Sequence, residues 1–410
     1  MDTGSTGHSV SRRGLLNTVT MAGVLGTASI ASAATSTSPC EGPSAKRFSS
    51  FAGPLQPIDD LALTAPLRED PAAIETYNVW LFDPDQNVAI NLHPTLQHGE
   101  MLTYITVFLP DGKILRGLDE RAKFTSPKQP HSKNITYTCE EPFRRWKYSG
   151  RNVPVFVTSD IEQGRGAVEA SEPTLKVSFD IDAITKAPPY IQGTLLPEAK
   201  VALQDIPGLW MASRLTSGPS PVARRYDQAL EGNGTITVGD QSYTFHGFGL
   251  RGHVRGVRVM DGMEGHSWIG AVFPSGMCMG IQAYPRSDGG YAMSEAYIYK
   301  DGIVYPNRII YASRFNRDPA VRRFVVELAC DELGRTRFVG EDRRTFYWAM
   351  SGWSGQPSVS EQTRSNRLRY GIDPAAPMIM RQAVATFECN GETGAGMHER
   401  SGSAATSEKW

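Results

Sequence analysis

The residues of this chain best suited to chemistry lie between His246 and Trp268. The stretch reads HGFGLRGHVRGVRVMDGMEGHSW and holds three of the chain's eight histidines, together with arginines, a glutamate and several glycines. Histidine and glutamate exchange protons, arginine binds anions, and glycine lets the backbone approach a ligand closely. The stretch therefore predicts an acid–base or anion-binding site. A polar end of a β-hairpin that is exposed to solvent and has no chemical role would account for the same residues.

Alternation predicts how these side chains would converge. Two rows occupy every second position: Arg251, His253 and Arg255, then Glu264, His266 and Trp268. Alternate residues of a β-strand share one face. If the two strands pair as a hairpin around residues 260–263, the rows would gather two guanidinium groups, two imidazoles and a carboxylate beside an indole. We expect His253, Glu264 and His266 to be the catalytic acid–base candidates, and Arg251, Arg255 and Trp268 to bind the substrate.

Other polar residues extend the candidate substrate site. Glu295 and Tyr297 alternate in SEAYIY, in a half of the chain rich in aromatic residues and methionine, a composition that suits a pocket for a bulky apolar ligand. His98 and Glu100 would share a strand face, as a ligand pair, an acid–base pair or a buried, satisfied polar pair. No third ligand is fixed by spacing, so we expect no metal.

A further cluster, Glu140-Glu141-Pro142-Phe143-Arg144-Arg145-Trp146, combines adjacent acids, adjacent bases and a tryptophan. We expect an ion-paired corner of the fold. The alternative is one buried glutamate whose pKa rises by desolvation until it donates a proton.

The elements around these residues are predicted to be β-hairpins. Strand-like runs are split by turn sequences at 83–85, 110–112, 274–276, 300–302 and 331–334. Because each sheet must bury one face, barrels or sandwiches are expected. We predict an all-β protein of two tandem lipocalin-like antiparallel barrels, residues 71–218 and 219–395, with a short helix near 221–230 and a flexible tail, 396–410.

Several motifs, in order, resemble a known family. They are YNVWLFDPDQNVAINLH, TVFLPDGKIL, CEEPFRRWKYSG, GFGLRGHVRG, GHSWIGAVFPSG and SEAYIYKDGIVYP. The chain resembles the two-domain, lipocalin-like family that includes bacterial carotenoid 1,2-hydratase, over roughly residues 75 to 345. The resemblance implies two barrel-like domains and cofactor-free protonation chemistry on a large apolar substrate. Related proteins usually read R-D-H-x-W-G where this chain has Gly252 and Arg255, so the usual candidate acid is missing.

These observations leave three hypotheses open. The first is an enzyme that acts on a large lipophilic molecule, such as an isoprenoid, steroid or polyketide, by hydratase, lyase, isomerase or cyclase chemistry without a cofactor. The second is a non-catalytic carrier of such a ligand. The third is a carbohydrate-binding or surface-interaction sandwich, which would need exposed coplanar aromatic residues.

The N-terminus predicts export. Arg12-Arg13 precedes a mildly apolar stretch and an Ala31-Ser32-Ala33 cleavage site, which is typical of a twin-arginine signal over residues 1–33, followed by a linker or arm over 34–70. We expect a periplasmic or secreted protein with no stable membrane insertion. A net charge of -1 gives no reason to expect nucleic acid. The sequence assigns neither an oligomeric state nor disulfide partners to the five cysteines.

Overall fold

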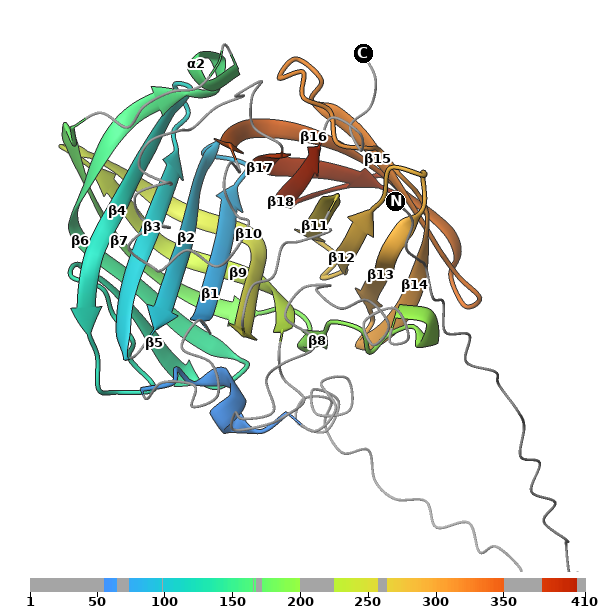
Figure 1. Cartoon of the computed structure of the whole chain (residues 1–410), viewed down its shortest axis with the longest axis horizontal. Helices are drawn as coiled ribbons and strands as arrows, with labels where there is room; N and C mark the ends of the chain where they lie inside the picture. The colour runs from blue at the N-terminus through green and yellow to red at the C-terminus, as the bar shows by residue number, and fades with distance from the viewer. Residues whose placement is uncertain are drawn as a thin grey trace, which may run out of the picture. The chain divides into compact units, whose positions relative to one another are not determined.

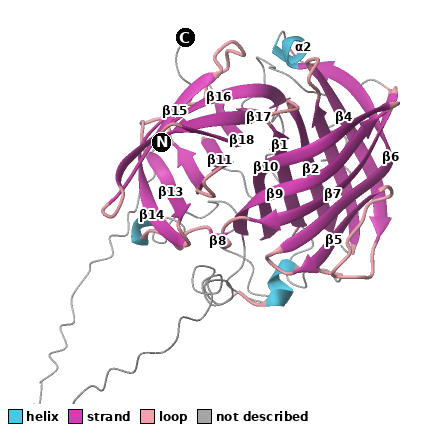
Figure 2. Ribbon diagram, turned by 180° about the vertical axis from the view of Figure 1, so that it is seen from behind, coloured by secondary structure: helices cyan, strands magenta, loops and turns pink. Residues whose placement is uncertain are grey.

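The computed structural model describes residues 55–64, 74–97, 99–164, 166, 172–199, 225–256, 264–349 and 378–403. The described chain is mainly antiparallel strand, with a 3-10 turn, η1 (Pro57–Asp60), a short helix, α2 (Asp160–Gly164), and a helical segment at 197–199 (Figures 1 and 2). None of the described helical segments has the length and apolar character needed to cross a membrane. The expected signal segment, residues 1–33, lies outside the described residues.

The first ten strands form the N-terminal barrel, in which eight strands close through pairing of β9 with β10 and the order is β10-β1-β2-β3-β4-β6-β7-β9. Short strands β5 and β8 add to β6 and β9. The bounds are β1 Ile74–Asp83, β2 Val88–Gln97, β3 Glu100–Phe108, β4 Lys113–Lys123, β5 Ile135–Glu141, β6 Arg145–Ser159, β7 Leu175–Thr185, β8 Tyr190–Ile191, β9 Arg225–Val238 and β10 Gln241–Gly256.

The next eight strands form the C-terminal barrel, which closes in sequence order from β11 to β18. Its strands are β11 Gly265–Val272, β12 Cys278–Pro285, β13 Tyr291–Lys300, β14 Ile303–Ala312, β15 Arg323–Cys330, β16 Gly334–Ala349, β17 Met378–Cys389 and β18 Glu392–Ser403. The predicted fold class, two tandem all-β antiparallel barrels, is confirmed.

Turn chemistry explains the hairpins. All five predicted turns join consecutive antiparallel strands, and Gly112, Gly276 and Gly302 there have φ values of 89°, 83° and 77°. Only glycine adopts this left-handed backbone without strain. The local sequence therefore determines where these strands reverse.

Three apolar layers follow from strand alternation. One core fills the N-terminal barrel and another fills the C-terminal barrel. A third joins outward-facing residues of both barrels and is rich in aromatic rings, among them Trp80, Phe108, Trp268, Phe346 and Trp348. We call this third layer the inter-barrel layer. Side chains next to each other in sequence thus enter different layers.

The change of barrel comes later in the chain than we expected. Strands β9 and β10 complete the N-terminal barrel, so the first strand of the C-terminal barrel begins at Gly265 rather than near residue 219. Residues 225–230 belong to β9 and not to a helix, because their pairing with β10, together with that of Tyr226 and Asp227 with β8 and of Leu230 with β7, outweighs local propensity. The last strand likewise runs through the expected tail as far as Ser403.

The four cysteines in the described residues, Cys139, Cys278, Cys330 and Cys389, are free thiols.

Candidate functional site

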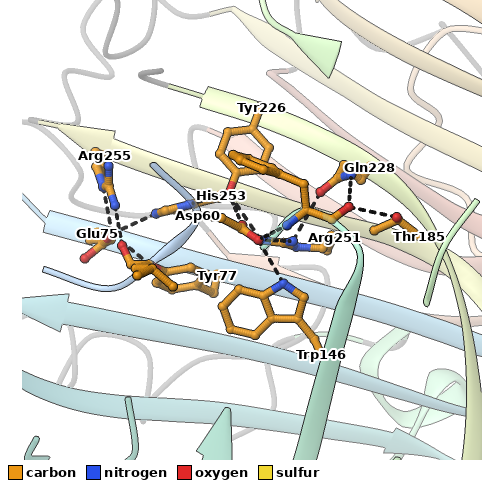
Figure 3. Close-up of polar contacts among 12 residues, drawn as sticks. Asp60, Glu75, Tyr77, Trp146, Thr185, Tyr226, Gln228, Arg251, His253 and Arg255 are labelled. Carbon is orange, nitrogen blue, oxygen red and sulfur yellow. Dashed lines mark hydrogen bonds and ion pairs between the residues drawn. The ribbon is translucent and has the colours of Figure 1, made fainter. Parts of the chain in front are cut away.

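The row Arg251, His253, Arg255 faces the interior of the N-terminal barrel. Their cross-strand partners on β1 are Val79, Tyr77 and Glu75, two of which belong to that barrel's core. All three side chains are buried. Together with Asp60, Glu75 and Tyr226 they form a network that we call the N-barrel cluster (Figure 3).

His253 lies at the centre of the N-barrel cluster, and both of its ring nitrogens are engaged. Its Nε2 lies 2.7 Å from Oε1 of Glu75, and its Nδ1 lies 2.8 Å from the hydroxyl of Tyr226. The imidazole stacks on the Tyr77 ring with centroids 4.0 Å apart. Arg255 Nε also donates to Glu75 Oε1, at 2.7 Å.

Asp60, at the end of η1, brings a second carboxylate into the cluster. It accepts hydrogen bonds from Arg251, from the Tyr226 hydroxyl and, at 3.1 Å, from Nε1 of Trp146. The Arg251 guanidinium lies over the Trp146 ring, 4.6 Å from its centroid. Figure 3 shows these groups converging on Asp60.

Charges in the N-barrel cluster balance, two arginines against two carboxylates. Burial alone would raise the pKa of Glu75, but Arg255 and His253 outweigh it and lower that pKa from 4.5 to about 2. Burial and the charge of Arg255 lower the pKa of His253 to about 4, so its imidazole is neutral at pH 7. The cluster is a closed ion-pair network that ties η1, β1 and β9 to β10.

The second row does not join the first. Strand β11 pairs with β12 and β18, not with β10, so the expected hairpin around residues 260–263 does not form. His266 and Trp268 lie on the outer face of the C-terminal barrel, and Glu264 lies before β11, where it accepts a hydrogen bond from the backbone of Ser287. Barrel closure takes both partner edges of β11, which leaves none for β10.

The remaining sequence candidates are dispersed. Glu295 is buried and accepts hydrogen bonds from the Tyr190 hydroxyl and the backbone of Gly193. Tyr297 packs near Tyr190, with ring centroids 5.6 Å apart. Glu100 lies 3.4 Å from Arg121 in a partly exposed ion pair. Its expected partner, His98, lies outside the described residues.

The acidic and basic cluster from Glu140 to Trp146 is an ion-paired corner, as expected. Arg145 Nε lies 2.7 Å from Glu140, and Arg144 lies 3.1 Å from Glu141. The four charged side chains are partly exposed, whereas Trp146 is buried in the barrel core.

Gly252, between Arg251 and His253, faces the other way and enters the inter-barrel layer. A Cβ atom at this position would lie 2.7 Å from Oδ1 of Asp227 and 3.0 Å from Cζ2 of Trp268. Asp227 is its cross-strand partner on β9. A carboxylate from one barrel and an indole from the other thus pack closely against Gly252, where no larger side chain fits. We call these three residues, with Arg225 and Gln282, the inter-barrel site.

The two oxygens of Asp227 have different surroundings. Oδ2 accepts a hydrogen bond of 2.7 Å from Nε2 of Gln282, whereas Oδ1 is buried and accepts none. Arg225 contributes a loose ion pair, its Nε 3.5 Å from Oδ1, and its guanidinium lies 4.9 Å from the Trp268 ring centroid. Nε1 of Trp268 is also buried without a hydrogen-bond partner.

Burial raises the pKa of Asp227 above its usual 3.8, and this effect exceeds the opposing influence of Arg225 and Gln282. A buried carboxyl group whose pKa is raised keeps its proton to a higher pH than a free carboxyl group, which is the direction that a proton donor needs. Asp227 Oδ1 thus has an ion pair with Arg225 but no hydrogen bond, and Trp268 Nε1 has no hydrogen-bond partner.

His266 reaches Asp227 through Gln282. Its Nε2 lies 3.3 Å from Gln282 Oε1, and its Nδ1 lies 3.5 Å from Oε1 of Glu399. With its oxygen turned to His266, the Gln282 amide presents its nitrogen to Asp227. One of the predicted catalytic residues therefore orients the neighbour of this carboxyl group.

Sequence reasoning missed Asp227 and Asp60. Arg225 and Asp227 alternate in RYDQAL, which would have placed both on one strand face had the segment been assigned to a strand. Asp60 follows Pro57 in the expected linker, and no periodic pattern there distinguishes it.

Within the described residues, no group of three or more His, Cys, Asp or Glu side chains is arranged to hold a metal ion.

Comparisons with solved structures found distant similarity. An AttH protein of Nitrosomonas europaea shares 13% identity, with a TM-score of 0.47, over 81% of this chain and 92% of that one. CghA with Sch210972 shares 11% identity, with a TM-score of 0.44, over 81% and 88%. Kievitone hydratase from Nectria haematococca shares 8% identity, with a TM-score of 0.39, over 84% and 92%.

No curated protein matches the chain. A family model does, over residues 57–403, which include every strand of both barrels. The chain therefore belongs to the family described as a domain of unknown function, DUF7064.

Proposed function

We propose that this protein is an enzyme that protonates a large lipophilic small molecule in the inter-barrel layer, with Asp227 as the proton donor. The reaction class is hydratase or lyase, or isomerase or cyclase, without a cofactor. The observation that carries this proposal is the buried Asp227 carboxyl group, whose Oδ1 accepts no hydrogen bond and packs closely against Gly252.

The hydrogen bond to Asp227 supports its role as an acid. A protonated carboxyl group has one hydroxyl oxygen and one carbonyl oxygen. Because Gln282 donates to Oδ2, the acidic hydrogen belongs on Oδ1. His253 was our first candidate for this role, but it is neutral at pH 7 and both its nitrogens are engaged. The donor proposal therefore moves from His253 to Asp227.

The surroundings favour an apolar substrate. The inter-barrel layer combines Trp80, Phe108, Trp268, Phe346 and Trp348 with aliphatic side chains from both barrels. Aromatic faces stabilise a developing carbocation through their electron-rich rings. The motif resemblance to the carotenoid 1,2-hydratase family implies the same class of chemistry, and Asp227 supplies the acid that is missing at Gly252.

The proton on Asp227 Oδ1 bonds to one carbon of a substrate double bond, and the π electron pair forms the new C–H bond. The cation left on the other carbon is captured by water or by a second double bond. Loss of a proton then returns Asp227 to its acid form. In the interval, Gln282 and Arg225 stabilise the aspartate anion.

The test begins with the protein purified from its own host. Native mass spectrometry should detect a co-purified lipophilic molecule, and that molecule is then the assay probe. We expect Asp227→Asn to lower its conversion by about 100-fold or more while affinity changes little. Asp182→Asn, at a partly exposed carboxylate of the N-terminal barrel, is the matched control and should react like wild type.

Retention of the ligand without any conversion by wild type would favour the carrier hypothesis and overturn catalysis. Equal conversion by wild type and Asp227→Asn would remove Asp227 from the mechanism. Export through the twin-arginine signal remains part of this proposal, and detection of the protein in the periplasm or medium tests it. We propose no nucleic-acid partner.

A further inference from the structure

A row of side chains with polar atoms crosses the outer face of the C-terminal barrel, within the inter-barrel layer. It consists of four successive cross-strand partners: Gln382 on β17, Glu399 on β18, Trp268 on β11 and Gln282 on β12. Direct cross-strand partners share one face of a sheet, and all four residues are buried. Polar groups are costly to bury unless they bond one another. The contacts along this row therefore show how its charge is accommodated.

Glu399 is the carboxylate in this row. Its Oε2 accepts a hydrogen bond of 2.6 Å from Nε2 of Gln382, and its Oε1 lies 3.5 Å from Nδ1 of His266. Gln382 is itself anchored, because its Oε1 accepts a hydrogen bond from Nε1 of Trp348. The Glu399 and His266 side chains are almost fully buried, which strengthens the interaction between them. The carboxylate is thus held by Gln382 on one side and contacts the imidazole on the other.

The Gln282 amide links His266 to Asp227. A carboxamide has one oxygen, which accepts hydrogen bonds, and one NH₂ group, which donates them. Because Nε2 of Gln282 donates to Asp227 Oδ2 at 2.7 Å, its Oε1 is left to accept from His266 Nε2, 3.3 Å away. His266 must then carry a hydrogen on Nε2. Since Glu399 lies beside Nδ1, that nitrogen needs a hydrogen as well.

A neutral imidazole could not satisfy both contacts. If its single hydrogen lay on Nδ1, facing Glu399, the Gln282 amide would turn over and donate to His266 Nε2. The amide oxygen would then face Asp227 and accept its acidic hydrogen from Oδ2. The proton would be taken up by this contact instead of lying on Oδ1. The form of His266 thus selects the oxygen of Asp227 that holds the proton.

We propose that Glu399 is a positioning residue that acts on Asp227 through two intermediate side chains. Its charge holds His266 with hydrogen on both ring nitrogens. The ring then fixes the Gln282 amide, which leaves the acidic hydrogen of Asp227 on Oδ1. Two further titratable groups lie around His266: Tyr284 of β12, with ring centroids 5.3 Å apart, and Asp227 of β9 itself. This inference rests on the function proposed above and names the residue that orients its acid.

Nitrogen-15 NMR of the full chain, labelled on histidine, tests the first step without a substrate. We expect the form of His266 with hydrogen on both nitrogens to persist to a higher pH in wild type than in Glu399→Gln, because the carboxylate stabilises the positive ring. The signals missing from His266→Asn identify the residue. If Glu399→Gln does not fold, Glu399→Asp takes its place and should give a smaller change in the same direction. Identical titrations in wild type and variant would overturn the proposal.

The infrared carbonyl band of protonated Asp227 tests the coupling through Gln282. Glu399→Gln should shift this band, because the acidic hydrogen moves from Oδ1, which has no hydrogen bond, to Oδ2, where it bonds the amide oxygen. In a Gln282→Met background the same substitution should leave the band in place, since the connecting amide is absent. An unshifted band in Glu399→Gln would overturn the proposal, and so would an equal shift in the Gln282→Met background.

Conversion of the co-purified molecule is the third readout. Glu399→Gln should lower kcat by about 10-fold with little change in KM, and Glu399→Asp should restore part of the loss. Glu388→Gln, at an exposed glutamate of β17, is the matched control and should react like wild type. Unchanged kcat in Glu399→Gln, with Asp227→Asn inactive, would overturn this inference alone. Unchanged conversion by Asp227→Asn would instead overturn the proposed function.

Discussion

Replacing Glu75 by Gln tests the interpretation of the N-barrel cluster as a stabilising ion-pair network. The substitution keeps the shape of the side chain but removes the negative charge between Arg255 and His253. The pKa of Glu75 lies at about 2 in the folded protein, against 4.5 in the absence of these interactions. This difference corresponds to roughly 3 kcal/mol of stability at pH 7.

The sign of the pH dependence follows from the lowered pKa. Stability supplied by Glu75 is fully present above pH 4.5 and is lost as the pH falls towards 2. The deficit of Glu75→Gln should therefore be nearly constant from about pH 8 to pH 5 and should shrink to roughly half by about pH 3.

Urea unfolding followed by circular dichroism measures this deficit at each pH. Glu100→Gln is the control, because its ion pairs with Arg121 and Lys123 lie at the surface, and it should cost at most about 1 kcal/mol. A deficit of less than about 1 kcal/mol for Glu75→Gln at pH 7, or one that grows as the pH falls, would refute the reasoning.

Three further predictions concern the inter-barrel site and the surface. Asp227→Asn should gain stability relative to wild type as the pH rises above 3.8, because the raised pKa of Asp227 makes the wild-type protein less stable as this group ionises. Urea unfolding at several pH values measures the difference in stability, and a variant that loses stability relative to wild type over this range would contradict the prediction. Gly252→Ala should displace Asp227 and Trp268, cost about 1 to 3 kcal/mol and reduce ligand retention in native mass spectrometry, and an unchanged complex would count against the proposed site. Arg145→Met should change stability by less than about 1 kcal/mol in urea, since its pair with Glu140 is half exposed, and a larger loss would show that the corner matters more than exposure suggests.

The hairpins could be predicted because turn chemistry is local. The pairs Asp111-Gly112 and Asp301-Gly302 each predict that the chain reverses direction within four residues, and the structure has a turn at both places. Strand alternation was equally informative. It correctly placed Arg251, His253 and Arg255 on one face of β10, and His266 and Trp268 on one face of β11.

Strand alternation does not predict which strand faces of the two barrels lie against each other. Convergence of Asp227, Gly252 and Trp268 depends on the register of β9 against β10 and on contact between two closed barrels. These are relations between residues far apart in the chain, and no local pattern encodes them. The two alternating polar rows on β10 and β11 suggested that these strands form a hairpin, whereas barrel closure places the two strands in different sheets.

Asp60 is a further residue whose contacts the local sequence does not predict. A segment rich in proline and polar residues reads as a linker, yet its aspartate bonds Arg251 and Tyr226 inside the barrel. Only the folded chain reveals that an arm supplies the counter-charge of a buried arginine.

Infrared difference spectroscopy tests the central claim most directly, by comparing wild type with Asp227→Asn for the carbonyl band of a protonated carboxylic acid. If Asp227 is the buried acid of the inter-barrel site, a pH titration of the wild-type protein retains this band to a pH above the usual pKa of 3.8, and the variant lacks the band. A wild-type band that is lost at or below pH 3.8 would contradict the account.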